Sequence, residues 1–394
     1  MNYIIFPGEL DIRRGGPSGY LANLQEGIQE IQREKEVRFI SKRSDGIISK
    51  DKVGKLKKII GKSNFLTEKI MKRKSIQLRH FPIHHELSSI VFQKGDIVHV
   101  HNVMDYNFLM KYNLNGAKVI LTPHTPESIA DEFVEVIRSN FNNQRLKLKN
   151  YKSTIKKIED SVFNKCEYFI FPSKESMEIY SSFIQDFDKI MLEKKIFFNL
   201  TGSKPLNYFI PKDAFRSKLG ISQEAFVISY IGRHNSIKGF DILVKVAKEI
   251  YKIDKDIIFI SGGTGNIKSD SPNFIEVGWT DDPGSIVNAS DLFILPNRNT
   301  YFDLVMLEVL SLGIPVIASS TGGNKSIAKL TEGIILFENE NITELVQKIL
   351  ILINNRDNLI KMGELNRSCY YEYFTLQHFS KRYLEVLKQI KNKE

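Results

Sequence analysis

The segment from residue 226 to residue 239 decides the fold, and it reads Phe226-Val227-Ile228-Ser229-Tyr230-Ile231-Gly232-Arg233-His234-Asn235-Ser236-Ile237-Lys238-Gly239. Its first six residues form a short, mainly apolar run, which is typical of a buried strand in a parallel sheet. Glycines and two cations, Arg233 and Lys238, follow at once. In open α/β sheets, ligands bind beyond the carboxyl ends of the strands. Because glycines allow close backbone approach and two cations can clamp a diphosphate, the segment predicts a site for a phosphate-bearing ligand.

Similar short apolar runs alternate with helical segments along the whole chain. Strands are expected at residues 3–6, 37–40, 96–100, 118–121 and 168–171, and then at 226–231, 257–260, 274–277, 292–295, 316–318 and 334–337. The apolar spacing predicts a helix over 19–33, and a long polar helical stretch fills 127–165. This alternation predicts two doubly wound α/β domains with parallel sheets covered on both faces. The stretch 199–211 is the expected boundary, which gives domains over residues 1–205 and 206–374.

The composition is that of an ordinary globular protein. Of 394 residues, 42 % are hydrophobic and 26 % are charged, which excludes a disordered chain or a collagen-like repeat. Two cysteines, Cys166 and Cys369, cannot form a disulfide framework and indicate a reducing compartment. No apolar run approaches the length that spans a bilayer, and residues 1–8 lack the features of a signal peptide. We therefore expect a cytoplasmic protein.

The positive charge is concentrated in the first half of the chain. The net charge is +10, and residues 1–195 carry 33 basic and 24 acidic side chains, against 23 and 22 in residues 196–394. Between Lys50 and Arg79 there are 11 basic residues and two acidic ones, with apolar residues near helical spacing. The segment Lys50–Lys74 is therefore either a basic amphipathic helix for an anionic membrane surface or a solvated lysine-rich face. Nucleic acid is not an expected partner, because no standard binding module is present.

Glycine and polar residues also follow most of the other expected strands. These loops contain Gly15 and Gly16, His101, His124, Gly262–Gly265, Gly278–Thr280, Asn297–Thr300 and Gly322–Gly323. Taken singly, each has a simpler interpretation, since glycine-rich loops are often only turns and a lone histidine is more often structural than catalytic. The loop 262–265 is neither a P-loop nor a dinucleotide fingerprint, because Ile267 and Lys268 stand where glycines would be required. No group of residues has the spacing of metal ligands.

Taken together, the order and spacing of these motifs resemble the GT-B glycosyltransferases of family 4. The residues that carry the resemblance are Gly232-Arg233, Lys238-Gly239, the run 304–319 with Glu308 and Gly313-Ile314-Pro315, Gly322-Gly323, Gly15-Gly16 and Val98-His99-Val100-His101. Residues 370–390 resemble the family's terminal helices, which cross back onto the first domain. The resemblance therefore implies a GT-B fold in which residues 375–394 return to the first domain.

The resemblance implies a role for each matching residue. Arg233 and Lys238 would bind the donor diphosphate and stabilise the charge that builds on the leaving nucleoside diphosphate. Glu308 would hold the ribose, and His101 would contact the donor sugar. The other donor-site residues would be Gly15 and Gly16 at the phosphate, Gly263 and Gly265 in the nucleoside loop, Gly278, Trp279 and Thr280 at the base, and Thr300, Phe302, Asp303 and Leu304 near the sugar and the phosphate.

One part of the sequence departs from the family pattern. Thr300 stands where the family has a glutamate eight residues before Glu308, and Phe302-Asp303-Leu304 replaces Phe-Gly-Leu. Two interpretations of Asp303 remain open. It is the N-cap of a helix over 304–312 that ends at Gly313, because aspartate is a preferred cap. Alternatively, Thr300 and Asp303 reshape the sugar pocket for an unusual donor.

The function that these residues predict is a retaining glycosyltransferase without a metal or other cofactor. It would move a sugar from a nucleoside-diphosphate sugar to a glycan acceptor in bacterial surface polysaccharide or glycoconjugate synthesis. UDP is the expected nucleotide from its frequency in the family, and the hypothesis for the acceptor is a lipid-diphosphate-linked glycan at the inner membrane face. Four alternatives stay open: a protein acceptor, a non-catalytic partner subunit of another glycosyltransferase, a sugar-nucleotide epimerase and a phosphorylase.

Overall fold

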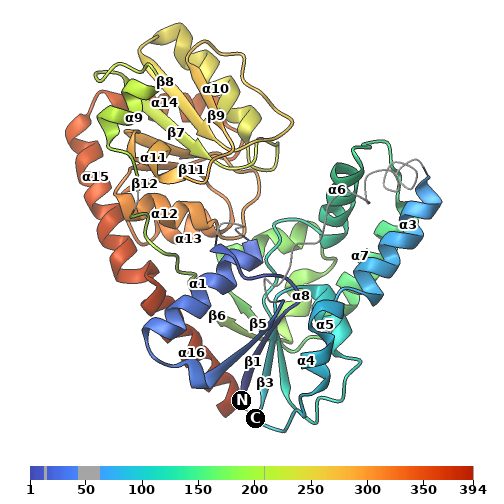
Figure 1. Cartoon of the computed structure of the whole chain (residues 1–394). Helices are drawn as coiled ribbons and strands as arrows, with labels where there is room; N and C mark the ends of the chain where they lie inside the picture. Colours follow the sequence, from blue (N-terminus) through green and yellow to red (C-terminus); the bar gives the residue numbers. More distant parts are fainter. Residues whose placement is uncertain (13–15, 43–62, 208, 394) are drawn as a thin grey trace. The chain divides into compact units, whose positions relative to one another are not determined.

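The computed structural model describes residues 1–12, 16–42, 63–207 and 209–393. The chain forms two compact units (Figure 1). Unit 1 comprises Met1–Phe171, Ile179–Asn199 and Lys381–Glu394, and unit 2 comprises Pro172–Glu178 and Leu200–Ser380. Each unit is built around one parallel sheet of six strands, so the prediction of two doubly wound α/β domains with parallel sheets is confirmed.

The sheet of unit 1 has the strand order β2-β1-β3-β4-β5-β6. Its strands are β1 (Asn2–Phe6), β2 (Val37–Ser41), β3 (Ile97–Val100), β4 (Lys118–Leu121), β5 (Tyr168–Phe171) and β6 (Lys195–Phe198). All residues of β3 and β5 are buried, because helices cover both faces. Figure 1 shows α1 (Gly16–Glu30) and α16 (Leu376–Asn392) on one side of the sheet and α4 (His84–Ser88) and α5 (Val103–Leu109) on the other. Strand β6 was not expected from the sequence.

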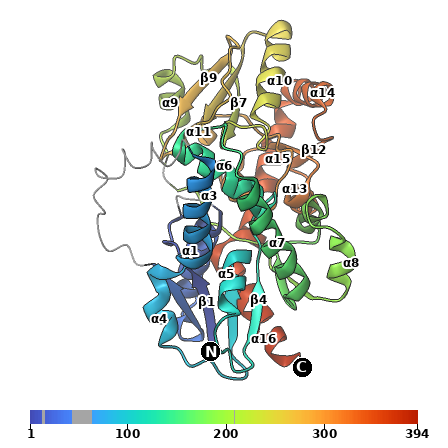
Figure 2. The same cartoon turned by 90° about the vertical axis from the view of Figure 1, so that its right-hand side faces the viewer.

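The polar stretch 127–165 is two helices, so the expectation of one long helical stretch is wrong. Helix α6 (Ile129–Phe141) ends where Asn142 adopts a left-handed backbone with φ +48°, and α7 (Lys149–Lys165) begins after Leu148, with φ +42°. Two left-handed residues reverse the chain direction, and α6 then packs against α7, as does α3 (Asn64–Lys72) (Figure 2). Among the described residues, unit 1 also contains α8 (Phe187–Leu192).

The sheet of unit 2 has the order β12-β11-β10-β7-β8-β9. Its strands are β7 (Phe226–Ile231), β8 (Ile257–Gly262), β9 (Phe274–Gly278), β10 (Leu292–Leu295), β11 (Val316–Ser319) and β12 (Ile334–Phe337). They confirm the six runs expected in the second half of the sequence. Five of the six residues in β7 are buried, because it lies in the middle of the sheet between β10 and β8.

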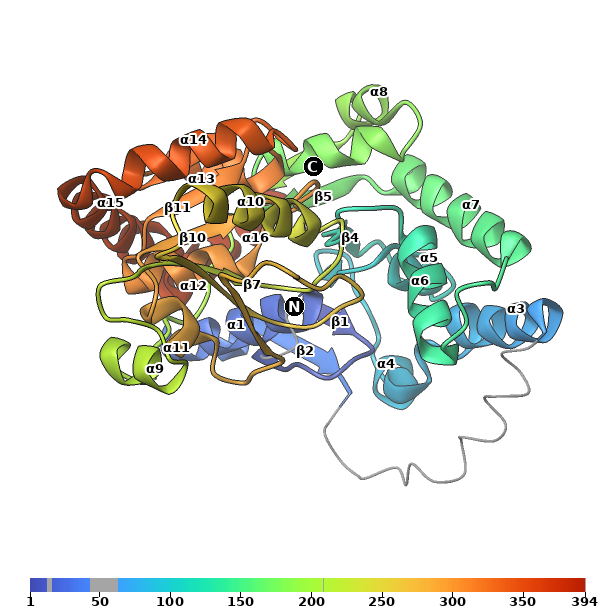
Figure 3. The ribbon, with the colours of Figure 1, turned by 90° about the horizontal axis from the view of Figure 1, so that it is seen from above.

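Helices also cover both faces of the second sheet. Helices α10 (Phe240–Ile253) and α14 (Ile342–Ile353) share one apolar core on the first face and lie side by side in Figure 3. Helices α9 (Lys212–Lys218) and α11 (Pro283–Asn288) contribute to a second core on the opposite face. The other helices of this unit are α12 (Leu304–Leu312), α13 (Gly322–Ala328) and α15 (Arg356–Cys369). None of the described helices is long and apolar enough to cross a membrane.

Candidate functional site

Three loops at the carboxyl edge of the unit 2 sheet pack backbone against backbone. Gly239 ends the loop after β7 with φ +67°, and a Cβ there would lie 1.8 Å from the carbonyl oxygen of Pro296, which follows β10. Gly263 follows β8 with φ +127°, and a Cβ there would lie 1.9 Å from the carbonyl oxygen of Gly232. Only glycine fits both positions. These contacts bring the loops after β7, β8 and β10 together, and with them Arg233 and Lys238.

The two cations of the β7 loop differ in their surroundings. Arg233 is exposed, and within the part of the chain that the structure describes its guanidinium has no ion pair or hydrogen bond. Its carbonyl oxygen accepts a hydrogen bond of 2.9 Å from the Tyr230 hydroxyl, which anchors the loop. Lys238 is half-buried, and its Nζ donates to Oδ1 of Asp303 at 2.6 Å. One cation therefore remains accessible for an anion, and the other is already neutralised.

Asp303 is not a capping side chain. Helix α12 spans Leu304–Leu312 and ends at Gly313 with φ +71°, as expected, and Asp303 is in the N-cap position. Its carboxylate, however, accepts no hydrogen bond from the helix amides and is instead held by Lys238 and by Nδ2 of Asn297. The expectation that Asp303 caps the helix is therefore wrong for the side chain, because the Lys238 ammonium and the Asn297 amide hold both of its carboxylate oxygens.

Unlike Asp303, the side chains of Glu308 and Thr300 have no hydrogen-bond partner among the described residues. Glu308 lies in the second turn of α12, and desolvation raises the pKa of its carboxyl to about 7. In the described residues, this carboxyl accepts no hydrogen bond and forms no ion pair. Thr300 is fully buried, and its Oγ1 has no hydrogen-bond partner within the described chain. The Glu308 carboxyl thus has free acceptor capacity for hydroxyl groups of a ligand, whereas the Thr300 hydroxyl is buried within unit 2.

The other residues predicted for this site lie around the same sheet edge. The backbone of Gly265 pairs with that of His234, and Gly278 ends β9 with φ +87°. Trp279 comes next and is 74 % exposed, so within unit 2 it does not line an enclosed pocket. Thr280 accepts a hydrogen bond from the amide of Asp282. Phe302 is buried in unit 2, and Leu304 begins α12.

His101 lies in unit 1 at the carboxyl end of β3, within a row of histidines. Its Nδ1 is 2.9 Å from Nε2 of His124, and its ring centre is 4.1 Å from that of His99. His99 bonds to the hydroxyls of Tyr383 and Thr122. Burial lowers the pKa of His99 and of His124 to about 3 and that of His101 well below its usual value. The row is therefore neutral at pH 7.

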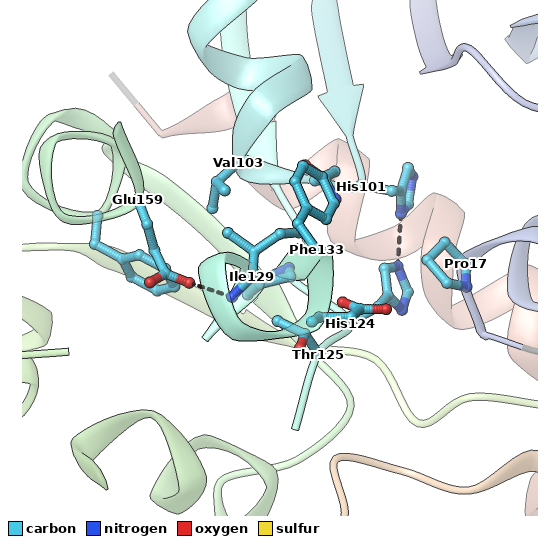
Figure 4. A pocket seen from close by; sticks show the side chains of 12 residues that line it. Pro17, His101, Val103, His124, Thr125, Ile129, Phe133 and Glu159 are labelled. Atoms are coloured by element: carbon cyan, nitrogen blue, oxygen red, sulfur yellow. Dashed lines mark hydrogen bonds between the residues drawn. The ribbon is translucent and has the colours of Figure 1, made fainter. Parts of the chain in front are cut away.

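A cavity of about 100 Å³ lies beside His101 and His124, and Figure 4 shows the side chains that line it. It is bounded by Pro17, His101, Asn102, Val103, Pro123, His124, Thr125, Ile129, Glu132, Phe133, Glu159 and Phe163. Pro17 follows Gly16, which begins α1 with φ +52°, whereas Gly15 lies outside the described residues. Sequence reasoning missed Glu132 and Glu159, because no local pattern separates them from the surface of a polar helix.

The described residues contain no group of three or more histidine, cysteine, aspartate or glutamate side chains that could hold a metal ion. Both cysteines, Cys166 and Cys369, are buried and unpaired, and burial raises the pKa of each thiol to about 12. Such thiols are inert at neutral pH.

Comparison with known proteins finds similarity to glycosyltransferases in part of the chain. Residues 225–355 match the family model of the glycosyl transferases group 1. D-inositol 3-phosphate glycosyltransferase 1 of Catenulispora acidiphila is 26 % identical over 180 residues, which cover 40 % of this chain and 43 % of that protein. The UDP-Gal:alpha-D-GlcNAc-diphosphoundecaprenol alpha-1,3-galactosyltransferase of Escherichia coli is 26 % identical over 151 residues, 35 % of this chain and 39 % of that one.

A solved structure extends the likeness to the whole chain. Sucrose-phosphate synthase from Thermosynechococcus elongatus aligns with a TM-score of 0.64 and 14 % identity over 99 % of both chains. The chain spans less than half the length of the curated relatives given above. The fold is therefore the GT-B fold, and residues 225–355 match the family model of the glycosyl transferases group 1.

Proposed function

We propose that the chain is a retaining glycosyltransferase that uses a nucleoside-diphosphate sugar and requires no metal. The observation that carries the proposal is the meeting of Arg233, Lys238 and Gly263 at one sheet edge in unit 2. Each comes from a loop at the carboxyl end of a parallel strand, where α/β sheets bind ligands. Arg233 is exposed and accessible to an anion, as the diphosphate of a donor requires.

The chemistry follows from charge. As the bond to the sugar breaks, negative charge grows on the leaving diphosphate, and a positioned guanidinium stabilises it. Arg233 supplies this charge without losing an ion pair of its own within the described chain. Glu308 would accept hydrogen bonds from the ribose hydroxyls, because its carboxyl has no partner among the described residues. His101 would contact the donor sugar as a neutral ring, since its pKa is well below the usual value.

The nucleotide is identified by binding. Trp279 is the single tryptophan and is exposed, so its fluorescence reports directly on a base that stacks at the end of β9. We would titrate UDP, GDP, ADP, dTDP and CMP, record fluorescence and thermal stability, and use Arg233→Ala as the control. Binding of UDP that is weakened in the variant is the expected result, and the name of the Escherichia coli relative contains UDP-Gal. If no nucleotide binds, the proposal fails.

The acceptor is proposed to be a lipid-diphosphate-linked glycan reached from an anionic membrane surface. The name of the Escherichia coli relative contains a diphosphoundecaprenol acceptor. Of the segment Lys50–Lys74, residues 50–62 lie outside the described residues, and 63–74 include α3. Phe65, Leu66 and Ile70 are exposed there beside Lys69, and Phe65 is 72 % exposed. Exposed apolar side chains among cations are typical of helices that bind in the membrane interface.

Co-sedimentation with vesicles tests this surface. The vesicles would contain about 30 % anionic lipid, which gives a moderately negative surface. The full chain should bind them at low salt and dissociate from them at high salt. Phe65→Ser combined with Lys69→Glu should reduce binding severalfold. Leu192→Ser with Lys189→Glu, on exposed positions of α8, is the matched control and should change little. Equal binding of both double variants would remove α3 from the proposal.

A further inference from the structure

The half-buried cation of the candidate site, Lys238, is already paired with a carboxylate of the same chain, that of Asp303. Nζ of Lys238 and Oδ1 of Asp303 are 2.6 Å apart, and 19 % and 17 % of the two side chains are exposed. The other carboxylate oxygen accepts from Nδ2 of Asn297, which is fully buried. Two donors from different loops thus hold Asp303 in one orientation, away from the amides of α12.

A diphosphate cannot reach Lys238 without meeting this carboxylate. Phosphate and carboxylate oxygens seek the same ammonium protons, and two anions beside one cation repel each other. Burial on both sides of the pair reduces screening by solvent and salt, so the competition is stronger than on an open surface. Arg233, by contrast, has no internal competitor among the described residues.

We propose that Asp303 is an internal competitor for the phosphate-binding group Lys238, so that the donor site binds a nucleoside diphosphate only by exchanging one anion for another. This inference rests on the proposed function. Asp303 is a positioning residue in this account, because it acts through Lys238. The exchange weakens the hold on the diphosphate product and so favours its release. It also makes binding depend on the number of phosphate charges rather than on the nucleoside.

The inference predicts tighter anion binding when the carboxylate is removed. Asp303→Asn and Asp303→Ala should each bind UDP and inorganic pyrophosphate about tenfold more tightly than the unmodified chain, by isothermal titration. Affinity for uridine, which has no phosphate, should stay the same. Pyrophosphate makes the test independent of the base. Asp270, whose side chain is 75 % exposed, forms an ion pair with Lys248, so Asp270→Asn is the matched control and should leave all three affinities unchanged.

A second background separates competition from a change of loop shape. With Lys238→Ala, replacing Asp303 should no longer raise pyrophosphate affinity, because the contested cation is absent. A loop that had merely moved would change uridine binding too. If one of the two Asp303 variants fails to fold, as judged by its Tm, the affinities of the other variant decide between competition and a change of loop shape.

The outcomes also distinguish this inference from the proposed function. If the unmodified chain binds UDP and both Asp303 variants bind it equally or more weakly, the inference is overturned and the proposed function stands. If pyrophosphate and UDP bind only to the Asp303 variants, competition is supported, and the proposed function of the unmodified chain fails. If no variant binds either ligand, both the inference and the proposed function fail.

Discussion

Nδ1 of His101 lies 2.9 Å from Nε2 of His124, and burial lowers the pKa of both imidazoles far below the usual value. One ring must donate and the other accept, and the lowered pKa values make both rings neutral at pH 7. In the unfolded chain each ring would take up a proton near pH 6.5. Between pH 6.5 and 3 the unfolded state therefore binds more protons than the folded state.

The pair predicts a loss of stability in mild acid. Stability should fall as the pH drops below 6.5, by about 2 kcal/mol at pH 5 for each such histidine. His124→Gln should flatten this dependence, and thermal unfolding at pH 5, 6 and 7 measures it. A His124→Gln chain whose Tm changes between pH 7 and pH 5 by as much as that of the unmodified chain would contradict the neutral pair.

Glu308 should show the opposite dependence. Its pKa of about 7 exceeds the unfolded value, so the folded state binds the extra proton and stability falls as the pH rises from 4.5 through 7. Glu308→Gln removes this penalty and should stabilise the chain at pH 8 by about 2 kcal/mol. The same change should weaken UDP binding about tenfold, because the glutamine amide has one acceptor oxygen and no charge, whereas the carboxylate offers two charged acceptors to the ribose hydroxyls. Urea unfolding and titration at pH 8 check both signs.

Two arginines should separate binding from stability. Arg233→Ala should lower UDP affinity and leave the free energy of unfolding within about 0.5 kcal/mol, because this guanidinium is exposed. Arg216→Ala should do the reverse, since the buried Arg216 donates to three backbone carbonyls and to Asp291. Its loss should cost about 3 kcal/mol or more. A destabilised Arg233→Ala chain would show that this loop has a structural role.

A pair of glycines tests the close packing of the loops. Gly239→Ala should cost several kcal/mol, roughly 3 or more, because the added Cβ would meet the Pro296 carbonyl oxygen. Gly220→Ala is the matched control, with φ +69° and nothing within 4 Å, and should cost only about 1 kcal/mol for the left-handed backbone. Nucleotide binding should be lost only in the first variant. Equal costs for both changes would contradict the backbone contact.

The sequence by itself determined the six strands of the second sheet, five of the six strands of the first, and the bounds of α12. A short, continuous apolar run favours a strand that is buried on both faces. A glycine such as Gly313 ends a helix because it readily adopts the left-handed backbone. Local patterns of this kind depend on neighbours along the chain. For the same reason, the loops after β7 and β8 could be recognised as possible phosphate sites.

Only the tertiary structure decided the partners of the site residues. Asp303 stands in the sequence position of a helix N-cap, yet its side chain binds Lys238, which is 65 residues away. Packing of the loops after β7 and β10 brings the Lys238 ammonium within 2.6 Å of its carboxylate. His101 and His124 follow the carboxyl ends of the neighbouring strands β3 and β4, and their hydrogen bond depends on the register of these strands. The division of residues 127–165 into α6 and α7 likewise depends on packing, because the left-handed turn at Leu148 has no local glycine to announce it. Side-chain pairing depends on distances between segments, and the spacing of residues along the chain does not contain them.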